Sequence, residues 1–168
     1  TTIRKNFPSF CIFSFGSSVK MTEGRMLKLD DREWATFEIG MLFDVQGTTT
    51  TKPSRLIADG TIPRITCSAM NNGLDGFYQN DPTEQGGVLT VDSAAIGYVA
   101  FQEHDFIATD HVEKLVLKGK KLTRALGLFF VTEITYAIQG KFNYGYKFSQ
   151  NRICRQRIAL PVTSTGEP

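Results

Sequence analysis

Residues 122–140 read LTRALGLFFVTEITYAIQG, the stretch with the clearest helical period in the chain. Its apolar side chains recur at the spacing that places them on one face of a helix. They are Leu122, Leu126, Phe129, Phe130, Ile134, Ala137 and Ile138. Lys120, Lys121, Arg124 and Glu133 fall on the opposite face, and Gly140 is a natural helix stop. The pattern predicts one long amphipathic helix from Leu122 to Ile138.

Short strands separated by turn residues are predicted on both sides of this helix. Asn71-Asn72-Gly73 and Gly86-Gly87 are the strongest turn signals, because Asn and Gly tolerate a positive φ. Strands are expected at residues 62–66, 88–91, 97–102, 106–108, 112–117 and 157–162. Residues 27–45 are expected to form a short strand or a helical turn, and residues 47–54 a polar loop. The predicted fold class is α+β, a mixed, mostly antiparallel short-stranded sheet with one long amphipathic helix.

The chain length of 168 residues indicates a single domain. We expect a lead-in segment at residues 1–24 and a single domain at residues 25–168. Arg4 and Lys5 precede an apolar run, which is reminiscent of a signal peptide, but Pro8 and several serines interrupt that run. An interdomain lead-in, or a chain start at Met21, accounts better for these residues.

Overall charge does not indicate a nucleic-acid-binding protein. The net charge is +2 and the pI is about 8.4, whereas a basic DNA-binding domain usually exceeds a pI of about 9. Cys11, Cys67 and Cys154 lie far apart in the sequence, an odd, scattered set that is typical of a reducing cytosol. No apolar run reaches the length of a membrane span, about 18 residues. A cytoplasmic location with no membrane partner is therefore expected.

The sequence contains no convincing catalytic constellation. His104 and His111 have no cysteine nearby, and the acidic residues between them do not match a metal-binding spacing. Asp81-Pro82-Thr83-Glu84 lacks the second proline and the aromatic residue of the amino-methyltransferase motif that stacks on a flipped base. Phosphate-binding glycine loops and nucleophile elbows are missing as well. We expect a non-catalytic protein that needs no metal and no cofactor.

Polar residues suited to DNA are concentrated in three segments between the predicted strands. Lysine and arginine neutralise phosphates, whereas asparagine, glutamine and arginine form the paired hydrogen bonds that distinguish base edges. From residue 141 to residue 157 there are five basic residues and no acidic residue. An ordinary solvated loop is the plain alternative for each segment taken alone. The candidate DNA-binding residues are Lys52, Arg55, Arg64, Asn71, Asn72, Lys141, Asn143, Tyr144, Lys147, Gln150 and Arg152.

Several short segments, taken together and in order, carry a family resemblance between residue 32 and residue 167. They are Arg32-Glu33-Trp34, residues 37–45, 60–65, 71–77, 90–91, 97–102, 106–112, 128–130, Lys141-Phe142-Asn143-Tyr144-Gly145-Tyr146-Lys147 and residues 158–162. The series resembles the target-recognition domains of type I restriction-modification specificity subunits. The series is also similar to the target-recognition domains of related type II systems, in which a separate chain provides the specificity.

This resemblance implies a DNA-reading domain that positions a DNA methyltransferase subunit, and often a restriction nuclease, on double-stranded DNA. Lys141, Tyr144, Gly145 and Lys147 match the recurring family pattern, which suits phosphate positioning or loop shape. Family chains usually carry two such domains separated by long helices that dock the methyltransferase subunits, whereas this sequence holds one. The rival hypotheses are a degenerate enzyme domain and a β-rich module that binds carbohydrate or peptide through Trp34, Phe77, Tyr144 and Tyr146.

Overall fold

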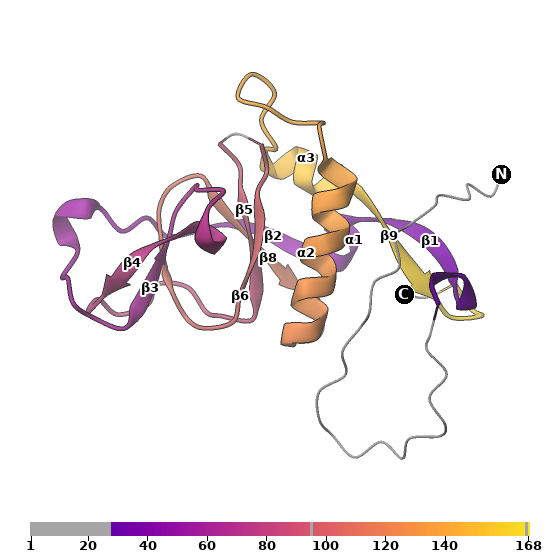
Figure 1. The fold of residues 1–168 in the computed structure, drawn as a ribbon, viewed down its shortest axis with the longest axis horizontal. Coiled ribbons are helices and arrows are strands. Elements are labelled where there is room, and N and C mark those ends of the chain that lie inside the picture. Colours follow the sequence, from indigo (N-terminus) through magenta and orange to yellow (C-terminus); the bar gives the residue numbers. More distant parts are fainter. Residues whose placement is uncertain (1–27, 95, 167) are drawn as a thin grey trace, which may run out of the picture. The chain divides into compact units, whose positions relative to one another are not determined.

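A computed structural model describes residues 28–94, 96–166 and 168 (Figure 1). The described residues divide into two compact units, one that contains residues 28–35 and the end of the chain from residue 160, and one within residues 36–159. The predicted lead-in at residues 1–24 lies outside the described residues, and the single domain at residues 25–168 stays a prediction. Within the described part, no helix combines the length and the apolar character needed to cross a membrane.

A four-stranded antiparallel sheet forms the centre of the larger unit. Its strands are β2 (Phe43–Gly47), β8 (Val112–Leu117), β5 (Val88–Asp92) and β6 (Val99–Gln102), in the order β2-β8-β5-β6. All five residues of β5 are buried, which is the pattern of a central strand covered on both faces. The predicted strands at residues 88–91, 97–102 and 112–117 are confirmed within this sheet, the middle one beginning two residues later than expected.

The long helix α2 (Arg124–Ile138) packs on this sheet, mainly on β6 (Figure 1). Thr123 caps it, since its hydroxyl oxygen accepts a hydrogen bond from the Leu126 backbone N–H at 3.4 Å. Phe130, Ile134 and Ile138 of the predicted face are buried, and Gly127 is buried with them. Gly127 was not predicted to matter, but a Cβ there would lie 2.4 Å from the Phe101 ring. The absence of a side chain at this position allows the close approach of helix and strand.

A smaller three-stranded sheet completes the larger unit. Its order is β4-β3-β7, with β4 at Leu74–Tyr78, β3 at Ile62–Ile65 and β7 at Ile107–Ala108. β3 is antiparallel to β4 and parallel to β7, which gives the predicted mixed character. The core beside this sheet contains Ile65, Val88, Phe106, Ala108 and Val112. Strand β4 was not predicted, because its sequence LDGFY places a glycine at the centre of a short segment.

Four elements, in residues 33–47 and 150–155, were missed or only loosely predicted. Residues 33–47 form a strand, a helical turn and a second strand: β1 (Glu33–Glu38), α1 (Ile39–Leu42) and β2. Helix α3 (Gln150–Arg155) was not predicted. Four and six residues are too few to reveal a helical period in a sequence. β9 (Arg157–Val162) was predicted as a strand, and it pairs with β1 in a two-stranded sheet.

Candidate nucleic-acid interface

The segment between α2 and α3, residues 141–149, forms an ordered loop that we call the tip loop (Figure 1). The backbones of Asn143 and Tyr146 exchange hydrogen bonds of 3.2 and 2.9 Å across its end. The Asn143 side-chain oxygen also accepts from the backbone N–H groups of Gly145 and Tyr146, at 2.9 and 3.0 Å. Asn143 therefore holds the tip in a tight turn, and its side-chain oxygen is already occupied.

A continuous stack of side chains connects the tip loop to the protein core. Phe148 is fully buried, and the Phe142 ring stacks on it at a centroid distance of 4.4 Å. Tyr146 lies nearly parallel to Phe142 at 5.7 Å, and the guanidinium of Arg152 lies 3.8 Å from the centre of the Tyr146 ring. Arg and aromatic faces attract one another in this arrangement. The stack gives a surface loop a fixed shape.

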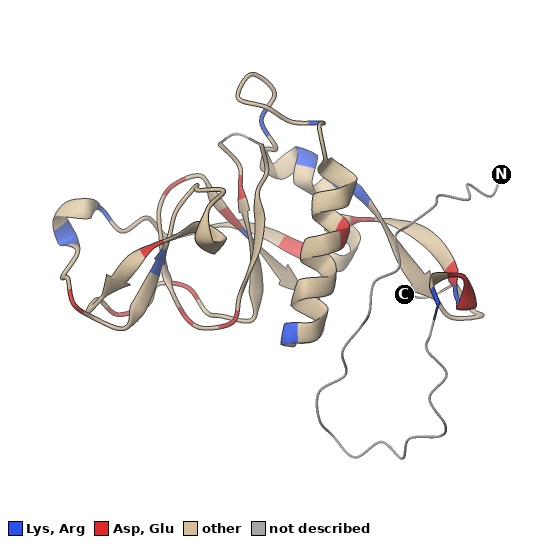
Figure 2. Cartoon of the chain, viewed as in Figure 1, with Lys and Arg blue, Asp and Glu red and all other residues tan. Residues whose placement is uncertain are grey.

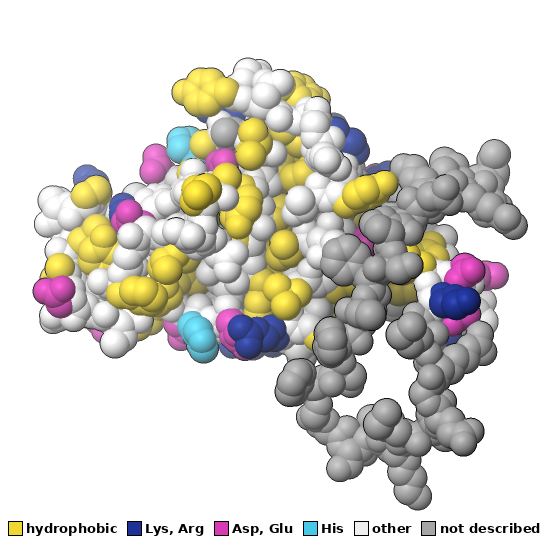
Figure 3. Space-filling model, in the orientation of Figure 1, with side chains coloured by type: hydrophobic (Ala, Val, Ile, Leu, Met, Phe, Trp, Pro, Cys, Tyr) yellow, Lys and Arg dark blue, Asp and Glu magenta, His cyan; other side chains and the backbone are white. Residues whose placement is uncertain are grey.

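The outer end of the tip loop is aromatic and cationic. Tyr144 is 78% exposed, and the ammonium of Lys147 lies 5.3 Å from the centre of its ring. Lys141 is exposed at the beginning of the loop. Figure 2 shows basic residues on this loop and on α3, and Figure 3 shows apolar side chains at the loop's outer end. A base or a phosphate can reach this combination of flat and charged groups.

The tip loop lies beside the ends of the central strands. A Cβ at Gly97 would lie 2.5 Å from the Phe148 ring, so the turn between β5 and β6 packs directly on the base of the loop. The Gln150 side-chain nitrogen donates to the Glu113 carboxylate at 2.6 Å, which joins the start of α3 to β8. Glu113 was missed from the sequence, because a single acid on an expected strand carries no signal of its partner.

The Asn71–Gly73 turn is the second predicted cluster. Asn71, Asn72 and Gly73 have φ values of 49°, 56° and 77°, three successive residues in the left-handed region. Gln102 is buried, and its side-chain nitrogen donates to the Asn72 carbonyl oxygen at 3.0 Å. The Tyr98 hydroxyl lies 3.5 Å from the Asn72 side-chain oxygen. The turn is therefore held from beneath while both asparagine side chains face solvent.

Arg64 occupies a different environment from the other candidates. Its side chain is only 10% exposed, and its Nη1 lies 2.5 Å from the Asp75 carboxylate. The Tyr78 hydroxyl donates to the same Asp75 oxygen at 3.2 Å, and the Arg64 Nε is buried with no hydrogen-bond partner among the described residues. This placement favours a role for Arg64 in holding β3 and β4 together.

Lys52 and Arg55 lie apart from the tip loop. They are exposed at the short helical turn Pro53–Arg55, at the left of Figure 2. Asn80 anchors this turn, donating to the Arg55 carbonyl at 2.8 Å and accepting from the Ile57 N–H at 2.9 Å. The structure thus brings Lys141, Asn143, Tyr144, Lys147, Gln150 and Arg152 together, and it leaves Lys52 and Arg55 as a separate basic site.

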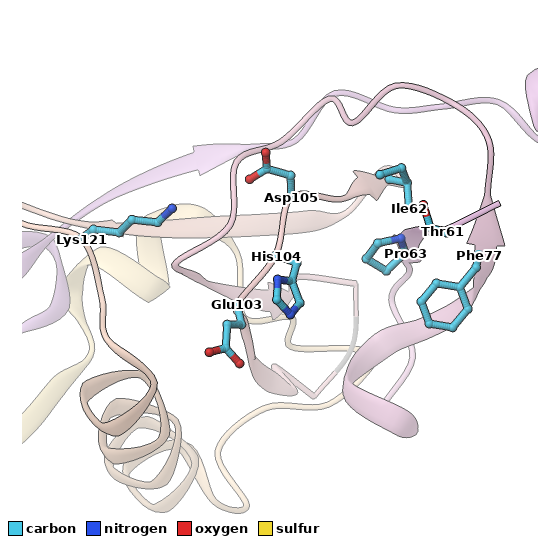
Figure 4. A pocket seen from close by; sticks show the side chains of 8 residues that line it. All are labelled: Thr61, Ile62, Pro63, Phe77, Glu103, His104, Asp105 and Lys121. Carbon is cyan, nitrogen blue, oxygen red and sulfur yellow. The ribbon is translucent and has the colours of Figure 1, made fainter. Parts of the chain in front are cut away.

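An open pocket of about 450 Å³ lies elsewhere on the larger unit (Figure 4). Glu103, His104, Asp105, Lys121 and Phe77 are among its lining residues. Figure 4 shows the carboxylates of Glu103 and Asp105 pointing away from each other, and Asp105 accepts a hydrogen bond from the Gly86 N–H at 2.7 Å. In the described ranges, no cluster of three or more His, Cys, Asp or Glu side chains could hold a metal ion.

An α+β domain that displays a basic, aromatic loop beside exposed amide side chains has the features of a nucleic-acid-binding protein. The family model described as "Type I restriction modification DNA specificity domain" matches residues 31–167. The chain belongs to this family of DNA specificity domains. The family that its sequence resembles is thereby confirmed.

Individual relatives agree with this assignment. The chain is 28% identical over 143 residues to the specificity subunit S.BcgI of a type II restriction enzyme from Heyndrickxia coagulans, a match that covers 83% of this chain and 41% of that protein. Its fold is similar to the S subunit of a type I restriction-modification system from M. genitalium, with a TM-score of 0.63, 12% identity and coverage of 83% and 37% of the two chains.

The HsdS subunit from Thermoanaerobacter tengcongensis is a second solved structure of similar fold, with a TM-score of 0.52 and 12% identity. That match covers 76% of this chain and 33% of the other. The chain therefore spans between 33% and 41% of the length of these relatives. The likeness confirms the predicted α+β fold class.

Proposed function

We propose that this domain binds duplex DNA through the tip loop and the neighbouring strand ends. The observation that supports the proposal best is the anchored stack from Phe148 to Arg152, which presents Tyr144 and Lys147 on a basic segment without acidic residues. Lys141 and Lys147 would neutralise phosphates, and such contacts position a protein without reading sequence. Domains that read different targets can share these residues.

Gln150, Asn71 and Asn72 are the proposed base-reading residues, since amide side chains form paired hydrogen bonds with adenine. Lys52 and Arg55 are further candidates at their separate site. Asn143 is better suited to holding the shape of the loop than to reading a base, because its side-chain oxygen accepts two hydrogen bonds within the turn. Arg64 is not part of the proposed surface, because its side chain is largely buried and paired with Asp75.

Within a longer specificity chain, the domain would position a methyltransferase subunit, and often a nuclease subunit, on one half of a DNA target in the cytoplasm. It would contribute no catalytic group, no metal and no cofactor. The alternative function, binding of carbohydrate or peptide, would use Trp34, Phe77, Tyr144 and Tyr146 as a platform. Only Tyr144 and Tyr146 lie in one loop, since Trp34 belongs to the smaller unit and Phe77 to β4.

The salt dependence of binding to random duplex DNA tests the proposal. A single domain with about four to six phosphate contacts should bind with a Kd of about 10⁻⁴–10⁻⁶ M at physiological salt, and log K should fall linearly with log salt. Joint replacement of Lys141 and Lys147 by alanine should flatten the slope by about two units. Replacing Lys28 and Lys120, which removes the same charge elsewhere, is the matched control. Equal effects of the two double variants would contradict the proposed surface.

A further inference from the structure

The Gln150 side chain donates a hydrogen bond to the carboxylate of Glu113. Among the described residues, no basic side chain forms an ion pair with that carboxylate. The Gln150 Nε2 lies 2.6 Å from Glu113 Oε2. The other carboxylate oxygen lies 3.1 Å from the hydroxyl of buried Ser93, whose single proton is shared with the His111 carbonyl oxygen at 2.9 Å. The neighbouring Lys114 forms its ion pair with Glu84 instead, at 2.5 Å. The Glu113 carboxylate therefore contacts Ser93 with one oxygen and Gln150 with the other.

This contact determines which way the Gln150 amide faces. A carboxylate only accepts hydrogen bonds, so the amide nitrogen, and not the oxygen, must point to Glu113. Gln150 is exposed, and its carbonyl oxygen and second N–H have no partner among the described residues. An acceptor next to a donor is the arrangement that pairs with the N6 amino group and N7 of adenine in the major groove.

We infer that Glu113 is a positioning residue that orients the Gln150 amide to read an adenine in the DNA target. The inference rests on the proposed function and deepens it by assigning a base to one side chain. Glu113 itself touches no DNA in this arrangement. Without it, the amide can rotate by half a turn and exchange its donor and acceptor, so the preference for adenine would be lost while the contact with DNA remained.

The experiment selects binding sites from a randomised duplex library with the 168-residue chain and three variants. We expect the wild type to prefer adenine at one position by about 5- to 150-fold, the range of one good paired contact. Gln150→Ala should lose that preference. Glu113→Gln should lose it as well, since the new amide can either donate or accept. Preferences at other positions should persist in both variants.

Glu103→Gln is the charge-matched control, because it also removes one carboxylate but from the pocket wall. Removing Glu113's charge near DNA should tighten binding to all duplexes alike, and the control should not. Retention of the adenine preference in Glu113→Gln, or in Gln150→Ala, would overturn the inference and leave the proposed function standing. A wild type that binds duplex DNA but selects no adenine would also overturn the inference alone, whereas a wild type that binds no duplex DNA would overturn the proposed function.

A measurement on the wild type guards against misfolding of the variant. In side-chain amide NMR spectra, one Gln150 proton should exchange slowly with water and shift downfield because it is bonded to a carboxylate. Two rapidly exchanging, unshifted protons would show that Glu113 does not hold the amide, and they would overturn the inference without any substitution at Glu113.

Discussion

The guanidinium of Arg152 lies 3.8 Å from the centre of the Tyr146 ring, and its Nη1 donates to the Lys147 carbonyl oxygen at 2.6 Å. One side chain of α3 thus binds both the ring and the backbone of the tip loop. The planar guanidinium can stack and donate at the same time, which an ammonium group cannot do. The shape of the loop therefore depends on arginine at this position and not merely on positive charge.

Arg152→Lys should loosen the tip loop although it keeps the charge. We expect the free energy of unfolding to fall by about 1 kcal/mol, the typical strength of a partly desolvated cation–π contact. Hydrogen exchange of the Tyr146 amide should become faster. DNA binding should weaken with an unchanged salt slope. Arg155→Lys, an exposed change on the same helix, is the control. Equal exchange rates in the two variants would show that the stack does not order the loop.

Lys147→Ala should weaken binding to every duplex by a similar factor. Its ammonium is placed over Tyr144 at the exposed end of the loop, where it suits a phosphate and not a base edge. Loss of one phosphate contact flattens the dependence of log K on log salt by about one unit. Binding measured from 50 to 200 mM salt gives this slope, with Lys120→Ala as the comparison. A selective loss on one sequence would instead assign Lys147 to base reading.

Asp75→Ala should destabilise the domain more than Arg64→Met. The alanine variant leaves the Arg64 guanidinium buried and unpaired, which costs about 2 kcal/mol when one partner of the pair is partly exposed. The methionine variant removes the buried charge and keeps the apolar stem, so it should cost less. Urea unfolding measures both, with Asp81→Ala as an exposed control. If Arg64→Met changes the slope of log K against log salt for DNA binding, Arg64 belongs to the DNA-binding surface after all.

The fold class could be predicted because periodicity and turn residues are local signals. The helix face from Phe130 to Ile138 and the strand at Val112–Leu117 are visible as apolar spacing, and the Asn71-Asn72-Gly73 turn follows from the tolerance of these residues for positive φ. Four-residue α1 and six-residue α3 leave no such period. The division of the strands among three sheets depends on contacts between distant residues.

The candidate site was predictable in type but not in arrangement. Local composition identified the basic, aromatic segment from Lys141 to Arg152, and the structure brings its members together. Sequence could not reveal that Asp75 binds Arg64 or that Glu113 binds Gln150. The two residues are 11 positions apart in the first pair and 37 in the second, and they meet only in the folded chain. Burial and partner choice arise from tertiary packing, and one sequence contains no direct record of them.

Cys67 should be almost unreactive in the folded protein. Burial, together with the nearby carboxylate of Asp92, raises the pKa of its thiol to about 12 from an ordinary value of 9.0. The thiolate is the reactive form, and a rise of about three units lowers its fraction at pH 8 by roughly a thousandfold. The Cys67 thiol also donates to the Asp110 carbonyl oxygen at 3.3 Å, which holds the proton in place.

The measurement uses a variant in which Cys11 and Cys154 are replaced by serine, so that Cys67 is the remaining thiol. Its reaction with a chromogenic disulfide at pH 8 should be slower by about two to three orders of magnitude in the folded protein than in urea, because the unfolded chain regains an ordinary thiol pKa. A folded pKa above the unfolded one contributes stability that is complete below about pH 9 and decreases as the pH rises further. Rapid labelling of the folded variant at pH 8, or stability that increases between pH 9 and pH 10, would contradict a half-buried, protonated Cys67.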